Sequence, residues 1–433
     1  MKYHFLGALC IALLVSCSDH SDEKEKKEAP NNKETAIDLG SNGTANCYIA
    51  SGANTFYKFN ATVMGNGLTT PSSKVVDSDN NTLQEAPAIT PVTLAPANVL
   101  VLWETGTKGN VINSESVSLS NGIVTFQTAD NNINGNAVIA VTNANNEILW
   151  SWHIWKVNYN PETDYDTYAK ITNNIPVGTF KMMKYNLGAT GTANWNGTAA
   201  NAGDLGLYYQ WGRKDPFLGI RGWDEQTNPF ILATYANGYS YQVIKNTAIG
   251  SNVSESLDYS IKHPEAFINF SSNSAYDWLA ASSYAEQRDN LWGNPNTGLT
   301  VPNATSGSKS IYDPCPPGWR VPGQDSYLIF AMKSDGTTIP NSSGSYRKGH
   351  TFYTQNFESG TTSFWPAAGT LTSNGVRYST SDGIYWTSSS YGGVFGSNTY
   401  YIAAGRLSFG STNVNTLSFE NRHSGAMIRC MKE

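Results

Sequence analysis

The sequence predicts a β-rich protein with two domains, an N-terminal antiparallel β-sandwich followed by an α+β domain. Three observations lead to this prediction. The chain has 433 residues, more than one typical domain contains. Short runs of strand-forming residues recur along it, separated by Asn, Gly, Asp and Pro. In the second half, the proline-rich segment IYDPCPPGWRVPG (Ile311–Gly323) restricts the backbone on both sides of Cys315.

The composition is typical of an extracellular protein rather than of a cytosolic enzyme. Charged residues make up only 14% of the chain, aromatic residues make up 12%, and the formal net charge is −6. The sequence contains no basic cluster of the kind that binds nucleic acid. We therefore expect no nucleic-acid partner.

The N-terminus has the pattern of a secretory signal. Lys2 precedes the apolar run Phe5–Val15, which is too short to span a bilayer permanently. The run ends at LLVSC, and its cysteine, Cys17, resembles the acylated cysteine of a bacterial lipobox. We expect residues 1–16 to be removed and acylated Cys17 to anchor the chain in the outer membrane. The alternative is an ordinary secretory signal with an incidental cysteine.

Residues 17–38 are predicted to form a disordered tether, because they are polar and show no apolar periodicity. Acidic residues that follow Cys17 resemble the export signal of Bacteroidetes surface lipoproteins; they are Asp19, Asp22, Glu23 and Glu25. This resemblance implies a lipoprotein exposed at the cell surface. The alternative is that the acidic residues only keep the tether solvated.

Residues 39–158 are predicted to form the β-sandwich. The strand-forming runs are Cys47–Ile49, Thr55–Phe59, Val99–Glu104, Ile123–Thr128, Ala137–Val141 and Ile148–Trp155. The last two runs predict a hairpin around Asn143–Glu147, and alternation places Ile148, Trp150, Trp152 and Ile154 on a core face. His153 lies on the other face. No second His or Cys has ligand spacing to it, which favours a hydrogen-bonded, half-buried histidine over a metal ligand.

Residues 159–433 are predicted to form the second domain, after a linker at Asn158–Ile175. Thr179–Ala189 predicts a strand that ends in a turn. Gly203–Phe217 is the best helix candidate, and Gln324–Met332 is a shorter one capped by Asp325 or Ser326. For Trp211 and Arg213 inside the first of these segments, core packing and structural pairing are favoured over a ligand site.

The remaining segments of the second domain predict loops and strands. Gly219–Ser310 has few periodic segments, and a long irregular insertion in a compact domain is usually functional. Asn374–Gly375 is a strong hairpin signal. Further strands are predicted at Ile384–Ser390, at Thr399–Phe409 and at the C-terminal Gly425–Met431.

Several motifs carry a resemblance to known families. DPCPPGWRVP, GLYYQWGRKDPF, YWTSSS and the closing IRC strand are similar to Bacteroidetes surface lipoproteins and to the "major paralogous" domain first named from Fibrobacter. That resemblance implies a fold like C-type lectins and the formylglycine-generating-enzyme group. ANCYI, TFYKF, the LWE stretch, NAVIAV and ILWSWHIW resemble a fimbrillin-type module, which implies the β-sandwich.

Three cysteines, Cys47, Cys315 and Cys430, remain outside the signal and the lipid anchor, and they allow three single pairings. Only Cys315 and Cys430 lie in the second domain, and an exported compartment permits oxidation. We therefore predict a disulfide between these two residues, which would tie the proline-rich segment to the last strand. Cys47 is then expected to be a buried free thiol.

The motif search does not favour an enzyme. The sequence contains no CxxC, HExxH, GxSxG or P-loop motif. Formylglycine-generating relatives use cysteines with copper or as a redox pair, whereas the two domain cysteines here are expected to be structural. No catalytic residue, cofactor or metal is predicted. Calcium binding is left open by fold analogy, although no acidic loop of the EF-hand type occurs.

The expected function is non-enzymatic binding at the cell surface, as an adhesin or a fimbria-associated protein for a protein or glycan ligand. The alternative is glycan capture for a nutrient-uptake system. The candidate ligand loop is the glycine-rich Tyr391–Asn398, which would display Tyr391 and Phe395. Stalk fimbrillins are cleaved after an arginine, but the first arginine here is Arg213. A terminal or stand-alone subunit is therefore expected, rather than a stalk unit.

Overall fold

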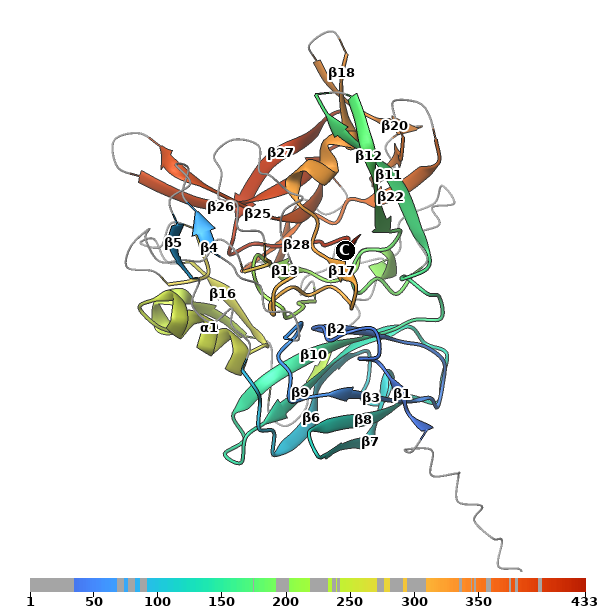
Figure 1. Ribbon diagram of the computed structural model, residues 1–433, viewed down its shortest axis with the longest axis vertical. Coiled ribbons are helices and arrows are strands. Elements are labelled where there is room, and N and C mark those ends of the chain that lie inside the picture. The colour runs from blue at the N-terminus through green and yellow to red at the C-terminus, as the bar shows by residue number, and fades with distance from the viewer. Residues whose placement is uncertain are drawn as a thin grey trace, which may run out of the picture.

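The computed structural model shows a β-rich protein in which a lower β-sandwich packs under a larger upper unit (Figure 1). The signal, Cys17 and nearly all of the tether lie outside the described residues. The described residues are 35–67, 74–76, 82–85, 92–173, 175–191, 202–218, 233–235, 239, 242–270, 276–280, 291–293, 309–334, 337–343, 345, 348–355, 360–373, 375–377, 381–395 and 399–433.

The sandwich consists of two sheets. The first has the strand order β1-β3-β8-β7, with β1 (Ile37–Asp38), β3 (Phe56–Asn60), β8 (Ile123–Thr128) and β7 (Ile112–Ser120). The second has the order β14-β6-β9-β10-β2, with β14 (Ala233–Tyr235), β6 (Asn98–Thr105), β9 (Gly135–Thr142), β10 (Ile148–Lys156) and β2 (Cys47–Ala50). Strand β1 lies inside the last residues of the expected tether. The sandwich is not wholly antiparallel as expected, because β1 pairs with β3, and β2 with β10, in parallel.

The predicted hairpin is confirmed, because β9 and β10 pair antiparallel with Trp152 opposite Ile139. Trp152 packs on Phe59 of the facing sheet, with ring centroids 5.0 Å apart. The opposite face of β10 is also buried, because the upper unit covers it. Trp155 there donates from Nε1 to the carbonyl oxygen of Ala189, at 2.6 Å. Strand β10 thus has a covered surface on both sides.

The upper unit is a set of small sheets. One has the order β11-β12-β29-β17, with β11 (Tyr165–Thr172), β12 (Ile175–Met183), β29 (Met431–Lys432) and β17 (Trp319–Arg320). A second has the order β13-β28-β23-β24, with β13 (Tyr209–Gln210), β28 (Gly425–Ala426), β23 (Thr370–Thr372) and β24 (Gly375–Arg377). The pairing of β23 with β24 confirms the predicted hairpin at residues 374–375.

The other sheets lie around these two. The two longest of the described strands lie in a sheet of order β25-β26-β27, with β25 (Gly383–Phe395), β26 (Thr399–Phe409) and β27 (Val414–Asn421). Another sheet consists of β20 (Ser342–Ser343), β21 (Gly349–Tyr353) and β22 (Thr362–Pro366). The strand pairs are β15 (Gln242–Lys245) with β16 (Ala266–Asn269), β18 (Ala331–Ser334) with β19 (Thr337–Pro340), and β4 (Lys74–Val76) with β5 (Thr82–Glu85).

The helix predictions fared worse than the strand predictions. Gly203–Phe217 is not a helix: it contains the end of a 3-10 turn, η2 (Ala202–Asp204), and the short strand β13. Almost every side chain after Asp204 in this segment is buried, and the chain turns back at Trp211–Gly212 so that Phe217 pairs antiparallel with Tyr208. It is therefore a buried turn and not a helix with one face on a sheet. The second candidate is a 3-10 helix, η4 (Gln324–Phe330), whose N-cap Gly323 makes no side-chain cap.

The described residues also contain an α-helix that the sequence analysis did not predict, α1 (Val253–Lys262), and the 3-10 turn η3 (Asn246–Ala248). Asn252 caps α1 by accepting a hydrogen bond from the backbone N–H of Glu255. The carboxylate of Glu255 in turn accepts from the N–H of Ser251 at 2.6 Å, which makes a capping arrangement close to the capping box.

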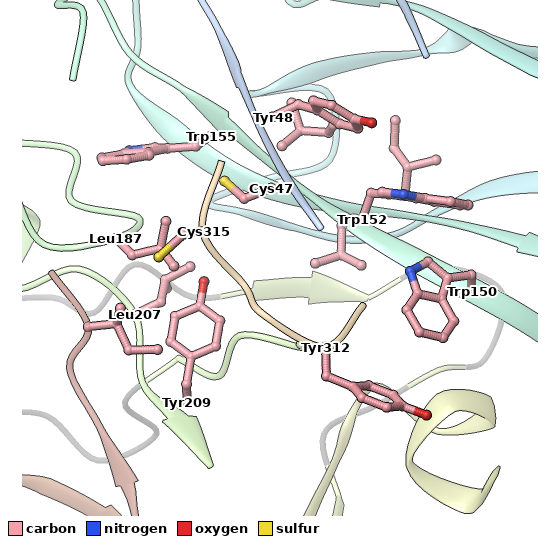
Figure 2. Packing of buried hydrophobic residues seen from close by; sticks show 14 of the residues in the cluster. Cys47, Tyr48, Trp150, Trp152, Trp155, Leu187, Leu207, Tyr209, Tyr312 and Cys315 are labelled. Atoms are coloured by element: carbon pink, nitrogen blue, oxygen red, sulfur yellow. The ribbon is translucent and has the colours of Figure 1, made fainter. Parts of the chain in front are cut away.

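The hydrophobic core runs from the sandwich into the upper unit without a break. Figure 2 shows tryptophans of β10 together with Leu187, Leu207, Tyr209 and Tyr312, all members of one buried cluster. The expected boundary between residues 158 and 159 falls just after β10, but packing and strand β14 cross it. A second buried cluster lies within the upper unit, around Trp365 and Phe409.

Candidate functional site

The proline-rich segment is held by a disulfide. Cys315 and Cys430 are bonded, as predicted, with their Cα atoms 6.0 Å apart. Both residues are fully buried, and Cys47 is a free buried thiol, also as predicted. Burial raises the pKa of the Cys47 thiol well above its ordinary value, so it is a weak nucleophile.

Lys309 lies inside the loop that this segment forms. Its Nζ donates to the carbonyl oxygens of Cys315, Pro316 and Trp319, at 2.5, 2.6 and 2.7 Å. Asp313 accepts hydrogen bonds from the backbone N–H groups of Cys315 and Val321. Burial lowers the pKa of Lys309, and burial raises the pKa of Asp313 to about 6 despite the nearby ammonium. These contacts give the segment a structural role.

A second buried polar cluster lies where β10 meets the upper unit. The Oγ of Ser151 is 2.5 Å from Nζ of Lys214 and 2.7 Å from Oδ1 of Asp215, and Lys214 and Asp215 form an ion pair at 2.6 Å. A hydroxyl beside an amine and a carboxylate is an arrangement that nucleophilic enzymes use. All three residues are at most 4% exposed, so a substrate has no access to this hydroxyl. The cluster joins the two units.

His153 belongs to the same junction. Its Nε2 is 2.9 Å from Oδ1 of Asn136, and its Nδ1 is 3.3 Å from the hydroxyl of Tyr209. Burial lowers the pKa of His153 to about 3, so the imidazole is neutral at physiological pH. This confirms the hydrogen-bonded histidine, although the side chain is fully buried and not half-buried.

Trp211 and Arg213 are packed in the interior, as predicted. Trp211 donates from Nε1 to the carbonyl oxygen of Thr387 at 2.8 Å, and Arg213 donates to that of Ala266. The guanidinium of Arg213 also lies over the ring of Phe217, 4.9 Å from its centroid. Both side chains are at most 2% exposed, which leaves no surface for a ligand.

The candidate ligand loop is a strand over most of its length. Tyr391–Phe395 forms the end of β25 and pairs with β26, so these residues are not in a loop. Residues 396–398 and the side chain of Phe395 lie outside the described part of the chain. Tyr391 is half-buried, and its ring stacks on that of Phe419 of β27, with centroids 4.6 Å apart and planes 9° apart.

This stacking forms an exposed apolar surface, here called the aromatic platform: Tyr391, Leu417 and Phe419. Leu417 is 47% exposed and Phe419 is 36% exposed. Strand β26 lies between β25 and β27, and its small residues Ala403 and Gly405 are the pairing partners of Tyr391 and Phe419. A side chain at Gly405 would collide with the amide of Gln324 and the hydroxyl of Thr387, so the glycine makes room for Gln324 beside the two rings.

The platform stands on a rigid base. Gln324 of η4 donates from Nε2 to the carbonyl oxygens of Arg406 and Thr416, one on β26 and one on β27. Its Oε1 accepts from Thr387 of β25 at 3.1 Å. One buried amide therefore joins all the strands of this sheet. Arg406 and Glu420 form an ion pair between β26 and β27.

The sequence analysis missed Leu417 and Phe419. The signal was present, because these residues alternate with polar neighbours in NTLSFEN, a period-2 pattern typical of a half-buried strand. The irregular insertion Gly219–Ser310 is described only in part; its described portions include β14, α1, β15 and β16. Cys17 lies outside the described residues, so its acylation stays a prediction.

Within the described residues, no group of three or more His, Cys, Asp or Glu side chains is arranged to hold a metal ion. None of the helices in the same part of the chain has the length and apolarity that a membrane crossing requires. Comparisons with family models, curated proteins and solved structures returned no match for this chain.

Proposed function

We propose that this chain is a cell-surface lipoprotein that binds an external protein or glycan through the aromatic platform. Acylated Cys17 would hold it in the outer membrane, and the tether would separate the fold from the lipid. The protein would act as an adhesin or as a terminal subunit of a fimbria, without catalysis. The lipobox-like LLVSC and the acidic tether support the anchor.

The exposed Phe419, stacked on the half-buried Tyr391, carries this proposal. Nearly all other aromatic side chains of the described residues are buried or half-buried, so an exposed phenylalanine beside an exposed leucine is unusual here. Contiguous exposed apolar side chains mark interaction sites. The stack covers the ring faces that Tyr391 and Phe419 turn towards each other, so a ligand would contact the exposed part of Phe419 and the side chain of Leu417. An apolar side chain or the apolar side of a sugar suits such a surface.

The fixed position of the platform supports a binding role further. Binding requires less ordering of side chains when they are already held in place. The rings of Tyr391 and Phe419 contact each other, and the sheet below them is held through Gln324. A ligand would therefore meet a preformed surface.

The test is binding of the non-acylated mature chain to glycan arrays and to immobilised extracellular matrix proteins. Phe419→Ala and Tyr391→Ala are expected to weaken binding at least tenfold, because each removes one ring of the pair. Phe56→Ala is the matched control, since it removes a half-buried phenylalanine from β3 of the sandwich. Loss of binding in the control, with full binding in both platform variants, would overturn the proposal.

A further inference from the structure

A pocket of about 420 Å³ lies at the sandwich edge, away from the aromatic platform. Its walls come from the first folded residues, 37–42, from β2 and β3, and from the turn after β10 at residues 158–162. Pro317 of the proline-rich segment closes one side. In Figure 1, β1 and β2 of this edge lie in the lower unit, whereas β25, β26 and β27 lie in the upper one. The two sites are therefore separate.

The aromatic part of the pocket wall offers one accessible ring. Tyr48 and Tyr57 are only 1% and 4% exposed, and their hydroxyls already bond to the backbone of Ala45 and Ser51. Tyr159 is half-buried, and its hydroxyl donates to the carbonyl oxygen of Ala189 at 2.6 Å. A cage for a quaternary ammonium ion needs several exposed ring faces, and these tyrosines do not provide them.

The polar part of the wall consists of amides, hydroxyls and carboxylates. They belong to Asp38, Ser41, Asn42, Ser51, Asn158, Asn160 and Glu162. No Lys or Arg is among the described residues that line the pocket, although Lys432 and Lys309 act on Glu162 from outside it, so an anionic ligand would lack a direct ion-pair partner in the wall. Burial raises the pKa of Glu162, and its carboxylate makes no hydrogen bond within the described part of the chain.

We propose that this pocket binds one residue of a neutral carbohydrate. Carboxylates accept from sugar hydroxyls, while asparagine amides both donate and accept, which matches the paired hydroxyls of a pyranose. The ring of Tyr159 would lie against the apolar face of the sugar. The volume falls within the range of small-molecule sites, about 300–1,000 Å³. This site is additional to the platform and does not depend on it.

The test is saturation-transfer NMR with the non-acylated mature chain. The neutral probes are glucose, galactose, mannose, N-acetylglucosamine and their β-linked disaccharides; sialic acid and tetramethylammonium represent the anionic and cationic classes. At least one neutral sugar is expected to receive saturation, and the two charged probes are not. Transfer to no neutral sugar, or to a charged probe alone, would overturn the proposal.

Variants of the wall locate the binding. Glu162→Gln and Asn42→Ala are each expected to weaken the sugar affinity about tenfold. The melting temperature should change little, because Asn42 is exposed and Glu162 is half-buried without a side-chain hydrogen bond within the described residues. Tyr159→Phe, which keeps the ring, should retain affinity within about threefold. Asn145→Ala, which removes an exposed amide from the β9–β10 turn, is the matched control. Unchanged affinity in Glu162→Gln and Asn42→Ala would show that the sugar binds elsewhere and would refute the assignment.

Discussion

The junction between the two units and the outer sheet β25-β26-β27 use polar and apolar groups in opposite ways. At the junction, charged and polar side chains such as Lys214, Asp215 and His153 are fully buried, and each has hydrogen-bond partners. On the outer sheet, Leu417 and Phe419 are exposed. Burying polar groups is unfavourable unless every one is paired, so the junction fits one arrangement only.

This contrast indicates that the junction serves stability and that the platform is suited to recognition. A substitution at the junction leaves a buried group without its partner, whereas one on the platform removes surface that water already contacts. The junction should therefore tolerate few changes, and the platform should tolerate many without unfolding. Each of the following experiments tests this contrast, beginning with the largest expected loss of stability.

The double variant Cys315→Ser, Cys430→Ser is expected to show the largest decrease in the free energy of unfolding. The two cysteines are 115 residues apart, and in the chain-entropy model a disulfide closing a loop of about that length stabilises by about 5 kcal/mol. Urea unfolding measures the loss. Cys47→Ala, which keeps the disulfide, should lose far less. Equal losses in the two proteins would contradict a structural role for the bond.

Lys309→Met is expected to destabilise the fold by about 3–5 kcal/mol, the usual result of removing one partner of a buried ionic group. The change removes the ammonium donor from the carbonyl oxygens of Cys315, Pro316 and Trp319; that of Pro316 still accepts from the backbone N–H of Trp319. Lys108→Met is the control because Lys108 is exposed, and such surface changes usually fall within about 0.5 kcal/mol. A loss below about 1 kcal/mol for Lys309→Met would mean that water replaces the ammonium.

The burial of His153 is expected to make the free energy of unfolding depend on pH. Its pKa is about 3 in the folded protein, against an ordinary value of 6.5, so the unfolded chain binds the extra proton between these pH values. Stability is full above pH 6.5 and falls as the pH drops towards 3, by at most about 1.4 kcal/mol per pH unit. Asp313, whose folded pKa is raised to about 6, acts in the opposite direction over part of this range.

Because the two groups act in opposite directions, the effect of His153 is measured by comparing the pH dependence of stability in the natural protein and in a variant without the histidine. His153→Gln keeps a hydrogen-bonding side chain next to Asn136 but does not titrate. Urea unfolding at several pH values should show a smaller fall in stability for the variant than for the natural protein below pH 6.5. If the free energy of unfolding falls equally with pH in both proteins, His153 does not cause the loss of stability below pH 6.5.

The sequence predicted those features that depend on local pattern or on covalent rules. The hairpin of β9 and β10 follows from alternation, and the disulfide follows from the shared domain of its cysteines. Helix α1 could have been predicted from its cap, since Asn252 and Glu255 have the N-cap and N3 spacing. Val253, Leu257 and Ile261 also recur every four residues, a spacing typical of a helix.

Other features depend on contacts between distant segments. Gly203–Phe217 has helical spacing but forms a buried turn in which Phe217 pairs back with Tyr208, because burial on all sides favoured a different path from the one that periodicity indicates. The addition of β14 to the sandwich sheet has no local signal. For the site, Tyr391 was predicted, but its partner Phe419 is 28 residues away and becomes a neighbour only when β27 pairs with β26.

The smallest change in stability is expected for substitutions on the platform. Two leucines ten residues apart, one buried and one on the platform, test this expectation directly. Leu407 of β26 is fully buried, so Leu407→Ala should cost about 2–5 kcal/mol. Leu417 of β27 is 47% exposed, so Leu417→Ala should change stability by about 0.5 kcal/mol or less. Under the proposed function, Leu417→Ala should still weaken ligand binding, because it removes apolar surface next to Phe419. Urea unfolding and the binding assay, done on the same two variants, separate the roles: a large stability loss for Leu417→Ala would mean that the platform belongs to the core and is not a surface for recognition.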